Sequence, residues 1–202
     1  MNGIDVSHNN GIINWDKVAQ NPAKIDFAYI KVSEGVNCTD ASFHFNATEA
    51  KRVGIKIGYY HFATLNTADD KIDAKAEADD FTNLLKAAPA ADLPPVLDIE
   101  LNKVNLDKPI VLDWINSFYN EMKVDGYNNT ILYSYTPFLD ASLPAGHNLG
   151  NIPLWLAAYV NAPNLKLPQG WGKYTIWQYS NKGIVTGING NVDLNTAPIA
   201  FF

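Results

Sequence analysis

Short apolar runs alternate with longer helical segments along this chain. The runs are rich in β-branched and aromatic residues and are bounded by glycine, proline or polar residues, which is typical of buried strands. We expect strands at residues 3–7, 26–32, 55–62, 93–100, 131–134, 153–159, 174–179 and 192–194. The pattern therefore predicts about eight strands.

Clear helical periodicity is confined to the first two thirds of the chain, at residues 15–20, 43–53, 70–88 and 109–123. Asp107 stands where the cap of the last of these helices is expected. In the 70–88 segment, acids and lysines lie opposite one apolar stripe, made of Ile72, Ala76, Phe81, Leu84, Leu85 and Ala88. No helical pattern follows the sixth strand, so the late wall of the fold should be irregular.

The alternation of strands and helices predicts one α/β domain with parallel pairing. Eight strands are enough to close a β/α barrel, and 202 residues suffice for one such domain. No linker, internal repeat or low-complexity tract divides the sequence. We therefore predict a single domain over residues 1–202, folded as an irregular TIM-like barrel.

The fourth apolar run ends abruptly in Asp98-Ile99-Glu100. Residues i and i+2 of a strand point to the same face, so the two carboxyl groups should point the same way. Charged residues are rarely buried unless they are paired or functional. The alternative is a strand that ends at the surface with two solvated acids.

Polar and aromatic side chains recur where the other strands end, and in β/α barrels those ends form the site. In chain order they are Asp5, Lys31, Glu34, Tyr60, His61, Asp98, Glu100, Tyr133, Trp155, Gln178 and Asp193. Carboxylates among aromatic rings suit a carbohydrate, because sugars stack on rings and donate hydrogen bonds to acids. Glycoside hydrolysis needs one protonated carboxyl group and usually a second one. Crowding of like charges keeps one group protonated.

Each of these residues also has a simpler explanation. Asp5 could cap a loop or a helix, and Lys31 could form a surface ion pair with Glu34. Tyr133 and Trp155 could be core aromatics. The convergence of several strand ends, rather than any single residue, favours the functional interpretation.

Composition narrows the function further. The net charge of −6 gives no basic footprint for nucleic acid, and no apolar stretch approaches the length of a membrane span. The four histidines form no pair at metal-ligand spacing, so we expect no metal, and we expect His61 to act through hydrogen bonds. The single Cys38 is expected to be a small buried hydrophobe. The N-terminus lacks a signal-peptide pattern.

Six segments of the chain resemble one family when they are taken together. They are GIDVSHNNG, FAYIKVSEG, GIKIGYYHF, PPVLDIE, PLWLAAY and WQYSNKGIVTGINGNVDLN, in this order over residues 3–195. The chain resembles the family 25 glycoside hydrolases, the Chalaropsis-type lysozymes. The resemblance implies a barrel with about five helices and a flattened wall. It also implies hydrolysis of the β-1,4 bond between N-acetylmuramic acid and N-acetylglucosamine in bacterial peptidoglycan.

The resemblance assigns roles to the site residues. Glu100 matches the general acid, Asp98 its close partner, and Asp5 and Asp193 the acids on the first and last strands. It implies retention of configuration, with the substrate's 2-acetamido group as a strong candidate nucleophile and an aspartate as the alternative. The residues expected to line the substrate groove are Lys31, Glu34, Tyr60, His61, Tyr133, Trp155 and Gln178.

The expected partner is the glycan strand of bacterial peptidoglycan, bound by a monomer without a cofactor. Many relatives add a wall-binding module, for which the sequence leaves no room. The missing signal pattern fits a phage endolysin released through a membrane lesion, secretion by another route, or a trimmed form of a longer protein.

Two other function classes are weighed against the muramidase. A non-catalytic glycan-binding barrel would typically lack the acid that Glu100 supplies. A metal-dependent hydrolase or deacetylase would need ligand spacing that the histidines do not have. For the muramidase, clustered acids predict a mildly acidic optimum, because Glu100 must be protonated while its neighbours mostly are not.

Overall fold

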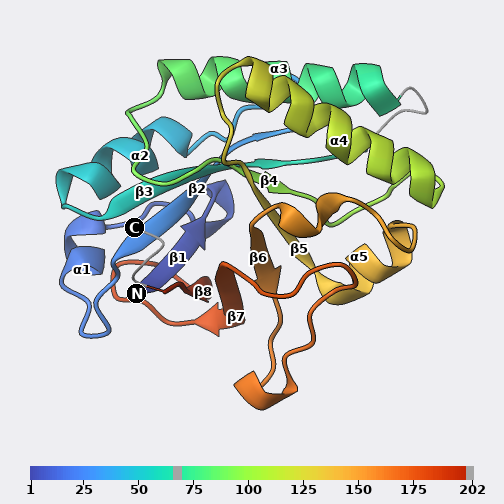
Figure 1. Ribbon diagram of the computed structural model, residues 1–202. Helices are drawn as coiled ribbons and strands as arrows, with labels where there is room; N and C mark the ends of the chain where they lie inside the picture. The colour runs from blue at the N-terminus through green and yellow to red at the C-terminus, as the bar shows by residue number, and fades with distance from the viewer. Residues whose placement is uncertain (66–69, 199–202) are drawn as a thin grey trace.

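Eight strands close a barrel in the computed structural model, which describes residues 1–65 and 70–198 (Figure 1). The strands are β1 (Asn2–Val6), β2 (Phe27–Glu34), β3 (Lys56–Phe62), β4 (Val96–Asp98), β5 (Ile131–Tyr135), β6 (Leu154–Ala157), β7 (Ile176–Gly183) and β8 (Val192–Thr196). The helices are α1 (Trp15–Ala19), α2 (Phe43–Arg52), α3 (Asp70–Ala87), α4 (Lys108–Val124) and α5 (Thr136–Ser142), with 3-10 turns η1 (His8–Asn10), η2 (Leu149–Asn151) and η3 (Ala162–Asn164). Within the described ranges, no helix is long and apolar enough to cross a membrane.

Strand order in the barrel follows chain order. Strands β1 to β7 pair in parallel, and β8 closes the barrel between β7 and β1, antiparallel to both. The predicted α/β class, eight strands and irregular barrel are confirmed. Parallel pairing is wrong for β8 alone, because residues 184–191 are too few for the crossover that a parallel neighbour requires.

The four predicted helices are present, with bounds that differ from the predicted ones by a residue at one or both ends. Helix α5 was missed, because seven residues that begin with a threonine and a proline are too short to show a period. Asp107 occupies the N-cap position of α4, but its side chain makes no capping hydrogen bond. In Figure 1 helices α3 and α4 lie side by side over one wall of the barrel.

The buried face of α3 differs from the predicted stripe. Ile72 is 68% exposed, whereas Asp73 and Glu77 are buried. Asp73 accepts a hydrogen bond from the Trp114 Nε1 at 2.9 Å, and Glu77 accepts one from the Thr64 hydroxyl at 2.7 Å. Buried acids that are compensated by hydrogen bonds escape a pattern that counts only apolar residues.

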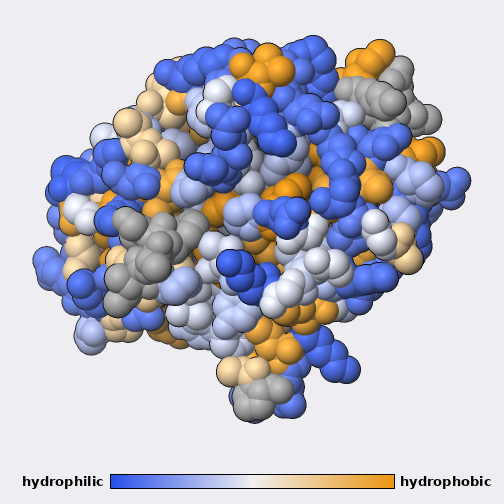
Figure 2. Space-filling view, in the orientation of Figure 1, coloured by the Kyte–Doolittle hydropathy of each residue, from blue (hydrophilic) through white to orange (hydrophobic). Residues whose placement is uncertain are grey.

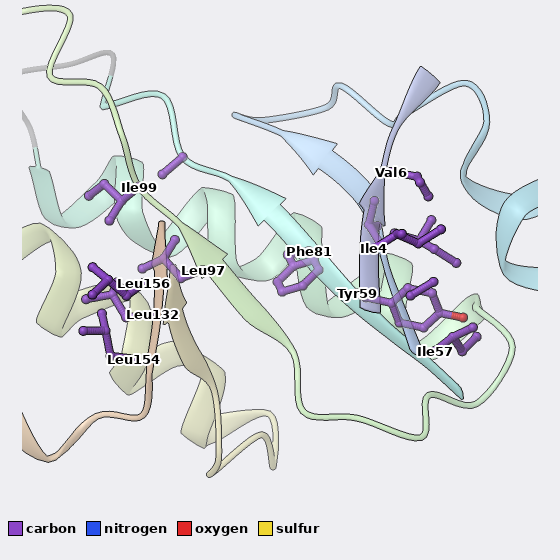
Figure 3. Close-up of a cluster of buried hydrophobic side chains, with 14 of the residues drawn as sticks. Ile4, Val6, Ile57, Tyr59, Phe81, Leu97, Ile99, Leu132, Leu154 and Leu156 are labelled. Atoms are coloured by element: carbon purple, nitrogen blue, oxygen red, sulfur yellow. The ribbon is translucent and has the colours of Figure 1, made fainter. Parts of the chain in front are cut away.

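Strand alternation divides the core into two layers. One cluster lies between the barrel wall and the helices, and Figure 3 shows part of it: Ile4, Val6, Ile57, Tyr59, Phe81, Leu97, Ile99, Leu132, Leu154 and Leu156. The other cluster fills the barrel interior with Phe27, Tyr29, Leu93, Val96, Ile131, Tyr133, Trp155, Ile176 and Ala197. Alternate residues of each strand therefore serve opposite layers.

Two glycines make room for the interior aromatic rings. A Cβ on Gly3 would lie 2.2 Å from the Phe27 ring, and a Cβ on Gly58 would lie 2.3 Å from the Tyr29 ring. The barrel interior is therefore closed by large side chains, and a cavity is left at its mouth.

Candidate active site

A cavity of about 370 Å³ opens where the parallel strands end. The predicted site residues that line it are Asp5, Lys31, Tyr60, Asp98, Glu100, Tyr133, Trp155 and Asp193. A volume of this size lies in the range of pockets for small ligands. The strand-end argument therefore brought most of the predicted residues to one place.

Asp193 reaches the mouth by a route that the sequence analysis did not foresee. It is the second residue of β8, and it pairs directly with Asp5 of β1. Because β8 is antiparallel, its start lies at the edge where its neighbours end. The expectation that Asp193 ends a strand was wrong, although its location at the mouth was right.

Asp5 and Asp193 form a carboxyl pair. Burial, followed by repulsion from Asp193, raises the pKa of Asp5 to about 8, so Asp5 holds a proton at neutral pH. The Oδ2 of Asp5 accepts hydrogen bonds from Gln178 Nε2 at 2.9 Å and from Asn195 Nδ2 at 2.7 Å. Burial also raises the pKa of Asp193.

Asp98 is buried, with 6% of its surface exposed. Burial, followed by the charge of Glu100, raises its pKa well above the usual value, against the opposing charge of Lys31. Among the described residues, its Oδ1 has no hydrogen-bond partner. A buried acceptor without a partner costs free energy, which a donor on a ligand would recover. Asp98 therefore offers an acceptor to a bound molecule.

Glu100 lies two residues beyond the end of β4 and is partly exposed. Burial, followed by the charge of Asp193, raises its pKa, while Lys31 opposes the shift. A carboxyl group with a raised pKa suits a proton donor. Glu100 also lines a second cavity of about 650 Å³, so it stands at the boundary between the two cavities.

Lys31 and Glu34 form an ion pair at the edge of the site. The Lys31 Nζ lies 2.7 Å from Glu34 Oε2 and 4.9 Å from the centre of the Phe62 ring. Lys31 lines the main cavity, whereas Glu34 lines a smaller hollow beside it, together with His8 and Asp40. The predicted ion pair with Glu34 is therefore present, but Lys31 is buried rather than at the surface, and its role in binding substrate stays a prediction.

His61 does not face the cavity, and the prediction that it lies at the mouth with Tyr60 is wrong. Neighbouring residues on a strand point to opposite faces, so only Tyr60 points inward. The His61 side chain is fully buried on the outer face of the barrel. There it hydrogen-bonds to Ser33 Oγ and Glu77 Oε2, both at 2.8 Å.

Gln178 lies behind the cavity and is not among the side chains that line it. It is 1% exposed, donates to Asp5, and accepts from the Tyr133 hydroxyl at 2.9 Å and the Tyr159 hydroxyl at 2.7 Å. Its contact with the site therefore runs through Asp5 and Tyr133, which both line the cavity. Trp155, which lines the cavity, is also a core residue, and its Nε1 donates to Asn195 Oδ1 at 2.8 Å.

Sequence reasoning missed several amides at the mouth. The asparagines that line the cavity are Asn9, Asn10, Asn181 and Asn191. Asn9 and Asn10 lie in η1, Asn181 lies in β7, and Asn191 directly precedes β8. Asparagine near a turn is common for turn geometry alone, so only their place close to the strand ends gave a signal.

Two further expectations concern metals and the cysteine. Within the described ranges, no group of three or more histidine, cysteine or acidic side chains is arranged to hold a metal ion. Cys38 is exposed, contrary to the expected buried position. It lies in the loop after β2 and lines the small hollow beside Glu34.

Comparison with known proteins relates this chain to one family. The model of the Glycosyl hydrolases family 25 matches residues 4–188. The chain belongs to this family. Lysozyme M1 of Streptomyces globisporus is 35% identical to this family 25 domain over 204 residues, which cover 96% of the chain and 67% of that protein.

Solved structures share the barrel as well. The bacterial lysozyme from Streptomyces coelicolor gives a TM-score of 0.84 at 33% identity, covering 98% of this chain and 91% of that one. The modular autolysin LytC from Streptococcus pneumoniae, solved with a synthetic peptidoglycan ligand, gives 0.81 at 28% identity, covering 96% of this chain and 46% of that one. The chain is therefore a lysozyme-type glycoside hydrolase, related to bacterial lysozymes, autolysins and endolysins. The predicted family and enzyme class are confirmed.

Proposed function

We propose that this family 25 domain cleaves the β-1,4 bond between N-acetylmuramic acid and N-acetylglucosamine in bacterial cell walls, with retention and with help from the substrate's 2-acetamido group. One observation carries the proposal. Glu100, whose pKa is raised, shares a cavity with Asp98, whose buried Oδ1 lacks a partner in the part of the chain that the structure describes. One carboxyl group is suited to donate a proton, and the other to accept an amide N–H.

In the first step, the acetamido oxygen of the muramic acid attacks its own C1. The bond from C1 to the glycosidic oxygen breaks, and this oxygen takes the proton of Glu100. Asp98 accepts the acetamide N–H through its Oδ1, which orients the group for its attack on C1. The first products are an oxazolinium ion and a chain end on glucosamine.

In the second step, water attacks C1 from the side that the leaving group has vacated. Glu100, now ionised, takes the proton of this water, and the ring of the oxazolinium opens. Two inversions at C1 give net retention. The proton taken from water restores the acid form of Glu100, which is then ready for another cycle.

Asp5 and Asp193 support this cycle through charge. The negative charge of Asp193 raises the pKa of Glu100 and helps to keep it protonated before the first step. The proton on Asp5 limits the charge at the mouth, where four carboxyl groups meet. All four come from one barrel, which supports a single catalytic domain over residues 1–202 that acts as a monomer on glycan strands.

The test uses purified peptidoglycan and the Glu100→Gln variant. Wild type should release fragments whose borohydride-reduced ends are muramic acid, identified by mass spectrometry. Glu100→Gln should lower kcat/KM by about 10²–10⁴-fold, because the proton donor is lost. Glu121→Gln is the matched control, since Glu121 lies on the outer helix α4 and pairs with Lys75.

Four results would contradict the proposal. Reduced ends on glucosamine would make the protein a glucosaminidase, and undiminished turnover in Glu100→Gln would remove the assigned acid. An α-configured fresh product, seen by NMR, would exclude retention. Wall binding without fragment release in wild type would indicate a glycan-binding barrel.

A further inference from the structure

A second cavity adjoins the catalytic one and shares Glu100 with it. It has a volume of about 650 Å³ and lies between the segments that follow β5 and β6. Its walls include Tyr135, Pro137, Ala158, Tyr159, Val160 and Lys166. The cavity is therefore larger than the catalytic one and mostly apolar.

The walls of this cavity are tied to the catalytic site and to each other. The Tyr159 hydroxyl donates to Gln178, which in turn holds Asp5. The Thr136 hydroxyl donates to the backbone oxygen of Lys166 at 2.7 Å, which joins the two segments. In Figure 1 the loop that carries η3 projects from the barrel, and Figure 2 shows apolar surface where this loop leaves the body. Tyr159 and Val160 of this loop are about half exposed.

The second cavity differs from the first in its balance of charges. The catalytic cavity is lined by four carboxyl groups and Lys31, whereas the second is lined by one carboxyl group, that of Glu100, and by Lys166. Among the residues that the structure describes, Lys166 has no ion-pair partner. Apolar walls with a free cation exceed what a neutral sugar needs. They suit a short peptide with small apolar side chains and a free carboxylate.

Peptidoglycan carries such a peptide on the lactyl group of each muramic acid, with alanine methyls and an acidic residue. We propose that the second cavity binds this stem peptide while the glycan strand occupies the catalytic cavity. The inference rests on the proposed function. Because Glu100 lines both cavities, a peptide on a sugar bound in the first lies within reach of the second. The enzyme should then favour glycan that bears peptide over bare glycan.

The test compares two substrates made from one preparation, uncrosslinked peptide-bearing glycan chains and the same chains stripped of peptide by an amidase. Lys166→Glu should raise KM for the peptide-bearing chains about tenfold, because an attraction becomes a repulsion, and should leave kcat unchanged. Its kinetics on stripped chains should equal those of wild type. Val160→Asp, which places a charge on an apolar wall, should show the same selectivity.

Lys173→Glu is the matched control. Lys173 is exposed beside Thr196 and Ala197, at the end of the barrel opposite to the mouth. Reversing its charge should therefore leave kcat and KM unchanged on both substrates. An equal rise of KM on both substrates in Lys166→Glu would mean that the cavity binds sugar, and no change on either would mean that it binds nothing in the reaction. Either result overturns the proposal. If the wild type cleaves neither substrate, the proposed function itself is wrong. Failure of this inference and failure of the proposed function are therefore distinguishable.

Discussion

Replacing His61 tests whether this residue stabilises the fold, as its buried position indicates, or contacts substrate, as the sequence predicted. It is fully buried and packs against the rings of Phe81 and Phe118, with centres 5.4 Å and 5.6 Å away. Its two nitrogens hydrogen-bond to Ser33 Oγ and Glu77 Oε2. His61→Ala would remove the ring and both hydrogen bonds, so we expect a loss of stability and no direct loss of catalysis.

The size of the effect follows from these contacts. Truncating a large buried side chain to alanine costs about 2–4 kcal/mol through lost contacts and the cavity left behind. Glu77 then loses one partner but keeps the hydroxyl of Thr64, so its share lies near the low end of the roughly 1–3 kcal/mol for an unpaired buried group. The sum is about 4 kcal/mol. In a domain of this length, that lowers the Tm by about 8–16 °C.

Thermal unfolding followed by circular dichroism measures this change, and kcat/KM is measured far below the midpoint of the variant. His44→Ala is the control, because His44 is exposed on α2 and its loss should cost less than about 0.5 kcal/mol. An unchanged Tm together with a raised KM for glycan would refute the reasoning, since it would show that His61 touches substrate.

Three further predictions concern pH, packing and metals. The folded pKa of Asp5, about 8, lies above its ordinary value of 3.8, so the native state holds an extra proton between these values. The free energy of unfolding should therefore fall as pH rises through this window, and Asp5→Asn should flatten the fall in urea titrations; a flat wild-type profile would contradict this. Gly58→Ala should lower stability by about 1–3 kcal/mol in the same titration, because the new Cβ would meet the Tyr29 ring, and an unchanged midpoint would mean that the ring can yield. Turnover should survive exhaustive chelation, since the proposed cycle uses carboxyl groups and the substrate's acetamide; activity lost and then restored by a divalent cation would argue against that cycle.

Local pattern was enough to predict the barrel and most of its mouth. Apolar runs of strand length separated by helices imply parallel pairing, and closure of eight strands brings their ends together. That argument placed Asp5, Asp98 and Glu100 in one cavity, as the structure has them. It needed only chain order and strand ends, both of which are legible in the sequence.

The direction of β8 and the facing of His61 were decided by tertiary structure. A strand end does not say which of two neighbours points inward, and at β3 the inward side is that of Gly58 and Tyr60. The helices then cover His61, and Glu77 of α3 compensates it, a contact between residues 16 positions apart. The sequence shows that both residues are present, but it does not show that folding brings their side chains into contact.

The chemistry divides in the same way. The sequence by itself determined which carboxyl groups meet, because residue type and strand position are local properties. Their protonation was decided by the assembled site, since burial and the charge of Asp193 raise the pKa of Asp5, and the same causes raise that of Glu100. The cluster of asparagines at the mouth and the apolar cavity beyond Glu100 likewise form only once distant segments meet, because chain order keeps their surfaces apart.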